Sequence, residues 1–186
     1  MADNASFFHD TRAPFITTDV AAVTLAATAK ALYTTAVVPV FPASYFGFVG
    51  KMLTIKLFGK ITTVLTPGNG SFDIYWGSGA DATGTILASS AALALTASQT
   101  NLSWTLEFDV RCTALGATGA LYCTGLAEFN AGVLATTLQP MMIPPSAAAA
   151  VTVDLTAANT ISVQFKRSGS TAETMAVQMV RVTPLN

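Results

Sequence analysis

The chain has 186 residues, of which 52% are hydrophobic and only 10% are charged, and its net charge is −1. That length suits one domain whose core needs neither a disulfide nor a metal to hold it together. A soluble domain usually carries about 25% charged residues, so this surface must consist mainly of uncharged side chains or be covered by other subunits. The nine basic residues are scattered singly, which argues against a nucleic-acid partner because no basic stripe is available to neutralise phosphates.

Residues 1–43 form the first of two predicted regions, an extended N-terminal arm that leads into the first core strand. They are rich in Ala and Thr and show no sustained hydrophobic period. A frayed or partly helical leader is the alternative, although β-branched residues weaken the helix that residues 21–31 would form. Ordering each residue costs about 1–2 kcal/mol of backbone entropy, so residues 1–30 are not expected to pack as an independent unit. We expect the arm to dock on a neighbouring subunit through four apolar anchors, namely Phe7, Phe8, Phe15 and Ile16.

The second predicted region, residues 44–186, is a succession of β-strands. In the first of them, Leu53, Ile55 and Leu57 alternate with polar residues, the period of two that marks a half-buried strand. The clearest strand is Leu102–Cys112, where every second residue from Leu102 is apolar and the residues between them are polar. A helix would scatter these two sets around its circumference, so the segment predicts one inward and one outward face.

Further strands are predicted at residues 71–77, 120–129, 160–167 and 173–182, separated by turns rich in Gly, Ser and Thr. Strands in this number, without a helix in the core, predict a sandwich or a barrel. The long connection at residues 131–149 suits Greek-key pairing better than a simple meander. The predicted fold class is therefore all-β, a jelly-roll-like antiparallel β-sandwich of about 8–9 strands with an extended N-terminal arm.

Neither a membrane span nor a secretion signal is predicted. Two uncharged stretches, residues 82–106 and 129–153, are long enough to cross a bilayer, but polar residues interrupt the first and prolines the second. The N-terminus lacks the basic and apolar regions of a signal peptide. We expect a soluble chain that is intracellular at synthesis, and no membrane partner.

The candidates for catalysis are few. His9 is the only histidine and lies in the predicted arm, where a solvated residue is expected. Glu107 and Asp109 lie two residues apart on the outward face of the clearest strand, and paired carboxylates perform acid–base chemistry when they flank a substrate. A solvated or intersubunit polar face is the favoured interpretation, so no enzyme activity is expected.

A calcium site has a weak basis in this sequence. Asp73, Asp81 and Asp154 are candidate ligands, because loops of jelly rolls often bind calcium. The ion takes six to eight oxygens and usually several carboxylates of one loop, whereas residues 77–81 offer one. We therefore expect no metal and no cofactor.

The aromatic residues and the two cysteines each have alternative interpretations. Tyr75 and Trp76, together with Tyr45 and Phe46, suggest a platform for stacking sugars, although aromatic residues in strands more often fill a core or a subunit interface.

A two-residue turn at residues 117–118 would place Cys112 opposite Cys123, within disulfide range. Without a secretion signal, two packed free thiols are favoured over a bridge.

The Ala/Thr/Gly-rich arm, the strand Leu102–Cys112 and the final segment Val180–Asn186 give the chain a texture that resembles decoration (cement) and related accessory proteins of tailed bacteriophages. The resemblance covers most of the chain and rests on no diagnostic motif. It implies a jelly-roll domain, commonly trimeric, that sits on the capsid lattice and holds neighbouring capsomers together. The implied partners are sister subunits, with a homotrimer favoured, and the major capsid protein or another virion protein; the implied location is the virion.

The sequence thus predicts a non-enzymatic virion structural protein. A carbohydrate-binding or receptor-binding jelly-roll module, as in a tail tip or head fibre, is the alternative. In that alternative Tyr75, Trp76 and the loop at residues 77–84 face solvent.

Overall fold

The computed structural model describes residues 21–33, 40–77, 80–130, 132, 140–168 and 172–185. In this part of the chain there are thirteen strands and no helix. The strands are β1 (Val23–Thr24), β2 (Lys30–Ala31), β3 (Val40–Phe41), β4 (Met52–Thr62), β5 (Asn69–Gly77), β6 (Thr85–Ser89), β7 (Leu93–Ala94), β8 (Leu102–Ala114), β9 (Gly119–Phe129), β10 (Met141–Ile143), β11 (Val151–Val153), β12 (Asn159–Arg167) and β13 (Thr174–Leu185).

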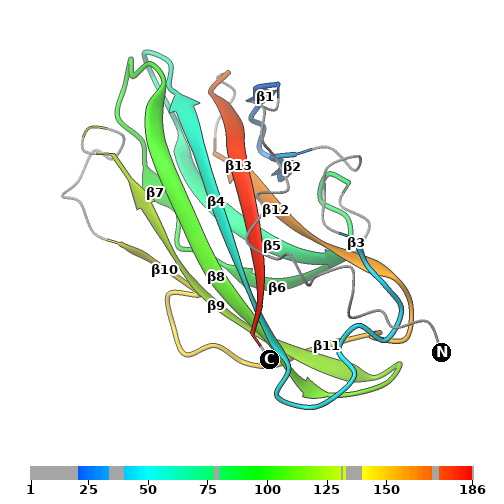
Figure 1. Cartoon of the computed structure of the whole chain (residues 1–186). Helices are drawn as coiled ribbons and strands as arrows, with labels where there is room; N and C mark the ends of the chain where they lie inside the picture. Colours follow the sequence, from blue (N-terminus) through cyan, green and yellow to red (C-terminus); the bar gives the residue numbers. More distant parts are fainter. Residues whose placement is uncertain are drawn as a thin grey trace.

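The strands form two antiparallel sheets that pack as a sandwich (Figure 1). The seven-stranded sheet has the order β1-β13-β4-β8-β9-β10, and β11 also pairs with β9. The six-stranded sheet has the order β2-β12-β5-β6, with β3 added beside β12 and β7 beside β5. The apolar inner faces of both sheets meet in one core.

The pairing of the strands is that of a jelly roll. β1 pairs with β13 and β2 with β12, while β4 pairs with β8 and β5 with β6. These pairs are nested along the chain, as if one long hairpin had been wound into two sheets, which is the jelly-roll arrangement. The predicted fold class is confirmed. The strands outnumber the predicted 8–9 because six of them have only two or three residues, too few for a period of two to be visible.

The two strands with the clearest alternation lie next to each other in the seven-stranded sheet. In β4 buried residues alternate with half-buried ones along its whole length. In β8 every second side chain from Trp104 to Cys112 points inward and is at most 1% exposed. Phe108 lies in the middle of this inward row, so the predicted inward and outward faces of the strand are confirmed.

The described part of the predicted arm belongs to the sandwich. β1 and β2 each add to a sheet, and the side chains of Leu25, Leu32 and Tyr33 are buried. The hydroxyl of Tyr33 donates to the carbonyl of Ile161 and accepts from the amide of Val163, both at 3.1 Å. The sequence did not predict that these residues belong to the sandwich, because two-residue strands show no hydrophobic period.

A buried ion pair fixes the path of the chain near β1. The guanidinium of Arg167 lies 2.8 Å from the carboxylate of Glu173, at the turn between β12 and β13. Arg167 Nε also donates to the carbonyl of Leu25, and the amide of Leu25 donates to the carbonyl of Glu173. Residues 21–33 are therefore held by the same core that they help to close.

Candidate interaction surfaces

The outer face of the seven-stranded sheet, here called the open face, carries most of its charge in two halves. Basic side chains lie on β4 and β13, which form the basic half, and acidic side chains lie on β8 and β9, which form the acidic half. Arg111, at one end of β8, is the exception in the acidic half. The basic residues of the first half are Lys56, Lys60 and Arg181, and the acidic residues of the second are Glu107, Asp109 and Glu128.

One row of the open face crosses from the basic half to the acidic half. The register places Arg181 beside Lys56, and Lys56 beside Glu107. Nζ of Lys56 lies 2.7 Å from Oε2 of Glu107, and both side chains are more than a third exposed. Arg181 is exposed and the described part of the chain gives it no ion-pair partner. The row therefore ends on an available positive charge.

A shallow cavity of about 430 Å³ lies in the acidic half. Glu107, Asp109 and Glu128 line it together with two apolar side chains, Leu126 and Met142. Met142 is 52% exposed, at the outer strand β10. The one cationic side chain in this lining is Lys56, which pairs with Glu107, so the cavity keeps an excess of negative charge.

The carboxylate pair considered for catalysis lies outward, as predicted, but each member already has a partner. Glu107 pairs with Lys56, and the hydroxyl of Thr54 donates to Asp109 Oδ1 at 2.5 Å. Within the described residues no three His, Cys, Asp or Glu side chains come together as metal ligands. The geometry gives these carboxylates the role of a charged surface.

The outer face of the six-stranded sheet, here called the closed face, is polar and yet buried. Most side chains that alternate with the core residues of β5 and β12 point to this outer side with an exposure of 9% or less, whereas Lys166 near the end of β12 is partly exposed. The set comprises Ser71, Asp73, Tyr75, Thr160, Ser162 and Gln164. Their burial means that segments of the chain cover this face.

The connection between β5 and β6 is one of these covering segments. The amide of Ala82 donates to Gln164 Oε1 at 2.7 Å, and Gln164 Nε2 donates to the carbonyl of Ala80 at 2.8 Å. A single buried side-chain amide thus satisfies both a donor and an acceptor of the connection. Gln164 lies beside Asp73 in the sheet, so the connection passes over the centre of the closed face.

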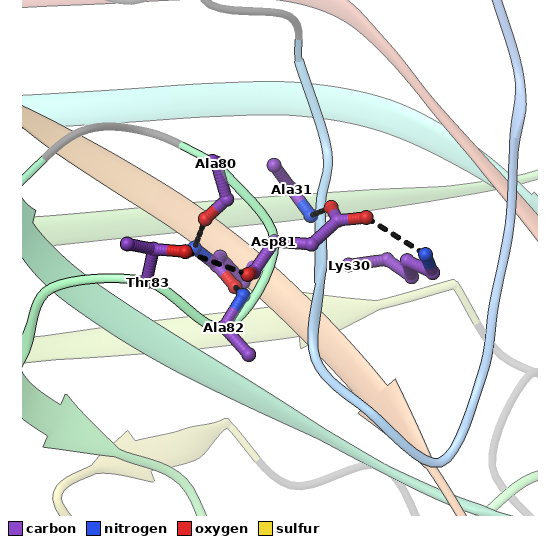
Figure 2. Close-up of polar contacts among 7 residues, drawn as sticks. Lys30, Ala31, Ala80, Asp81, Ala82 and Thr83 are labelled. Carbon is purple, nitrogen blue, oxygen red and sulfur yellow. Dashed lines mark hydrogen bonds and ion pairs between the residues drawn. The ribbon is translucent and has the colours of Figure 1, made fainter.

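Asp81 ties the same connection to the edge strand β2 (Figure 2). Its Oδ1 accepts from the amide of Ala31 at 2.8 Å, and its Oδ2 accepts from Lys30 Nζ at 2.7 Å. Burial alone would raise the pKa of Asp81, but the hydrogen bonds from Lys30 and Ala31, with the charge of Lys30, lower it below its usual value. Asp81 is therefore ionised, and its carboxylate holds the connection to β2.

The three candidate calcium ligands lie apart and are used separately. Asp73 is 1% exposed and has Lys166 Nζ at 3.2 Å from its Oδ2. Asp81 binds β2, as described above, and Asp154 Oδ1 accepts from the amide and the hydroxyl of Thr156. These hydrogen bonds lower the pKa of the exposed Asp154. Each carboxylate serves the local structure.

The aromatic residues considered for sugar stacking are buried. Trp76 is 5% exposed, packs against Phe41 and Phe46, and donates from Nε1 to the carbonyl of Asp154 at 3.1 Å. Tyr75 is 6% exposed on the closed face, and burial, followed by the negative charge of Asp73, raises its pKa. Neither ring offers a free face on which a sugar would stack.

The predicted position of Cys112 opposite Cys123 is wrong. Cys112 pairs with Leu121 and Cys123 with Val110, because a bulge between Cys112 and Ala114 and a longer turn shift the register. Both cysteines are buried free thiols on the inner face. Burial, with a smaller effect of the Asp109 charge, raises the pKa of Cys123 to about 12, so this thiol stays protonated at neutral pH and packs as a small apolar group.

Exposed apolar side chains gather at one end of the sandwich, here called the apolar end. Phe48 and Val49 precede β4 and are 48% and 59% exposed, and Leu115 in the turn after β8 is 46% exposed. The amide of Gly50 donates to the carbonyl of Cys112 at 2.8 Å, which brings these two segments together. Leu185, 40% exposed, lies beside Met52 at the same end, where Figure 1 shows the C-terminus.

The apolar end was not predicted from the sequence, although two adjacent apolar residues in a connection indicate it. Phe48 and Val49 are adjacent apolar residues in a connection, flanked by Gly47 and Gly50. Gly50 has φ of +97°, a conformation that only glycine adopts without strain. The turn at Gly50 therefore follows directly on this apolar pair.

The four arm anchors Phe7, Phe8, Phe15 and Ile16, together with His9, lie outside the described residues. The docking of the arm on a neighbouring subunit therefore stays a prediction. No helix in the described part of the chain is long and apolar enough to span a membrane.

A comparison of the sequence with models of known protein families found no match, and a search of curated proteins found no significant similarity. The jelly-roll sandwich and its surfaces are thus the basis for a functional proposal.

Proposed function

We propose that the chain is a non-enzymatic virion structural protein, a capsid decoration or cement protein that stabilises a phage head through subunit contacts. The observation that supports this best is the apolar end. Phe48, Val49, Leu115 and Leu185 are all at least 40% exposed there, and such grouped apolar side chains mark protein–protein contact sites.

The composition agrees with a permanent place in an assembly. Charged residues make up 10% of the chain, whereas a domain that stays dispersed on its own usually needs more charge. The proposed partners are sister subunits, as in a trimer, and the major capsid protein. In this proposal the apolar end faces the capsid, and the anchors Phe7, Phe8, Phe15 and Ile16 reach a neighbouring subunit.

Attachment to a capsid tests the proposal. Capsids assembled from the major capsid protein encoded in the same genome are incubated with the purified chain and sedimented. Burying an apolar side chain contributes about 1.5–3 kcal/mol, and about 1.4 kcal/mol corresponds to a tenfold change in affinity. The double change Phe48→Ser with Val49→Ser is therefore expected to weaken attachment by more than about tenfold.

Leu65→Ser provides the matched control. Leu65 is 78% exposed and lies beyond the opposite end of β4, so its replacement removes an exposed apolar side chain away from the apolar end. We expect its attachment to equal that of the natural chain. Failure of the natural chain to bind capsids, or binding of an isolated glycan on an array, would overturn the proposal.

A further inference from the structure

The open face is complementary to a second copy of itself. Its basic half lies on β13 and β4 and its acidic half on β8 and β9, and these strands follow one another in the order β13-β4-β8-β9. A two-fold axis that runs along the strands, midway between β4 and β8, places β4 of one copy over β8 of the other. The same axis places β13 over β9. Each basic half then meets an acidic half.

We propose that two copies of this chain pair through their open faces about such an axis. Contacts related by a two-fold axis occur twice, so the proposal needs complementary groups on both sides of the axis. The row Arg181, Lys56, Glu107 provides them, because it carries two positive charges on one side and a negative charge on the other. Face-to-face sheets keep their strands within about 30° of each other, so this central row stays close to its copy.

At the centre of the pair, the Lys56–Glu107 ion pair meets the same ion pair in reverse. Lys56 of one copy lies over Glu107 of the other, and Glu107 over Lys56, which forms an alternating group of four charges. Both side chains are accessible for this contact, at 36% and 51% exposure. Opposite potentials that meet in this way fix the register of an interface and exclude wrong arrangements.

The cavity of the acidic half gives Arg181 of the second copy a place to bind. The cavity of about 430 Å³ has an excess of negative charge, from Asp109 and Glu128, and an apolar wall at Met142. Arg181 is exposed on β13, the strand that the axis places over β9. A guanidinium donates to two carboxylates in a planar fork while its stem packs on apolar side chains, which suits this lining.

The size of the open face is sufficient for a stable pair. Four strands about 4.8 Å apart, each about eleven residues long at about 3.4 Å per residue, cover roughly 700 Å². A standard interface buries about 800 Å² on each partner. Apolar side chains, namely Phe58, Leu126 and Met179, lie between the charges on the same face and become buried with them.

The pairing goes beyond the proposed function, because it needs no capsid and its charged row does not include Phe48 and Val49, the two residues of the apolar end that the capsid test changes. It is expected in solution as a particle with an even number of chains, a dimer, or a hexamer where the chain also forms trimers. Capsid attachment and pairing are therefore measured on the same variants, and either can fail while the other holds.

Charge reversal tests the pairing. Arg181→Glu puts an acidic side chain opposite the acidic cavity, and Glu128→Arg puts a basic side chain opposite the basic half. Each variant alone is expected to show half the natural mass in light scattering at about 0.1 M salt. An equimolar mixture of the two is expected to regain the full mass, since each copy then supplies the charge that the other lacks.

Ala92→Glu is the matched control, because it adds a charge to an exposed residue in the connection between β6 and β7; it should keep the natural mass. Salt at about 1 M, where the screening length falls from about 10 Å to about 3 Å, should weaken the natural pair. A melting curve for each variant shows that it is folded. The proposal is overturned if the natural chain has an odd number of subunits, if both reversed variants keep the natural mass, or if their mixture fails to restore it.

Discussion

The outer faces of the two sheets differ in what covers their polar side chains. On the closed face, Gln164 is bound by the connection between β5 and β6, and Asp73 is buried beside Lys166. On the open face, Arg181 and Glu128 are exposed. The first face is completed by its own chain, whereas the second has charge and a cavity available for another molecule. A polar residue in a strand therefore does not by itself indicate that the face of the sheet on which it lies is exposed to solvent.

The same comparison explains why the strands look different in the sequence. In β4, buried and half-buried residues alternate, whereas β5 is buried continuously from Gly70 to Trp76. Buried and more exposed residues alternate along a strand where one face of the sheet is exposed to solvent. Where the chain covers that face, residues such as Asp73 and Tyr75 become part of a second, polar interior.

The largest expected effect lies beneath both faces, in the shared core. Phe108→Ala should lower the free energy of unfolding by about 3–5 kcal/mol, the range for a buried Phe truncated in a packed core, because Phe108 is 1% exposed in the middle of β8. Denaturant melts measure this loss. A loss below about 1 kcal/mol would mean that the inward face of β8 is wrongly assigned.

On the closed face, Gln164→Ala should cost about 1–3 kcal/mol. The change removes the two hydrogen bonds that the buried amide of Gln164 makes with the amide of Ala82 and the carbonyl of Ala80, and each such bond contributes about 0.5–1.5 kcal/mol. Thr152→Ala, at an exposed residue in β11, is the control substitution. If the two variants melt alike, the connection does not depend on Gln164.

A smaller effect on stability is expected from the contacts of Asp81 with β2. Asp81→Asn should cost about 0.2–1 kcal/mol at neutral pH, because the ion pair with Lys30 is partly exposed. The pKa of Asp81 is lowered in the folded chain, so its stabilising effect is present above the pKa of the unfolded chain, about 3.9, and is lost as the pH falls through the folded value. Urea melts from neutral pH into the acid range should show the difference between the natural chain and Asp81→Asn disappearing below about pH 4. A difference that grows in acid would contradict this sign.

The smallest effect is expected on the open face of a single copy. In the Arg181→Glu background, where pairing is lost, the coupling between Lys56 and Glu107 should be below about 0.5 kcal/mol, since both side chains are largely solvated. A double-mutant cycle with Lys56→Gln and Glu107→Gln measures it. A coupling above about 1.5 kcal/mol in that background would show that this face is covered even in the single chain.

The fold class and the long strands could be predicted from the sequence because their apolar residues recur with the period of a half-buried strand. The short strand β1 could not, since two residues carry no period. The register of Cys112 was missed because the sequence does not reveal the bulge between Cys112 and Ala114. Turn length sets the register of a hairpin, and one extra residue displaces every later pair.

The surfaces were harder to predict than the core. Glu107 and Asp109 were correctly placed outward, because the alternation of β8 determines their direction. The ion pair between Asp81 and Lys30 joins residues 51 positions apart, and no local sequence pattern predicts that they come together. Tyr75 and Trp76 were considered as ligand-facing residues, but the cover over β5 and the rings of Phe41 and Phe46 bury them.

The contrast between a face closed by its own chain and a face reserved for a second copy is tested most directly by labelling of carboxylates. The natural protein and the Arg181→Glu variant are treated with a water-soluble carbodiimide and an amine, and the labelled residues are identified by mass spectrometry. We expect Asp73 to be unlabelled in both proteins, and Glu107 and Glu128 to be protected in the natural protein and labelled in the variant. Equal labelling of Glu107 and Glu128 in the two proteins, or labelling of Asp73 in either folded protein, would contradict it.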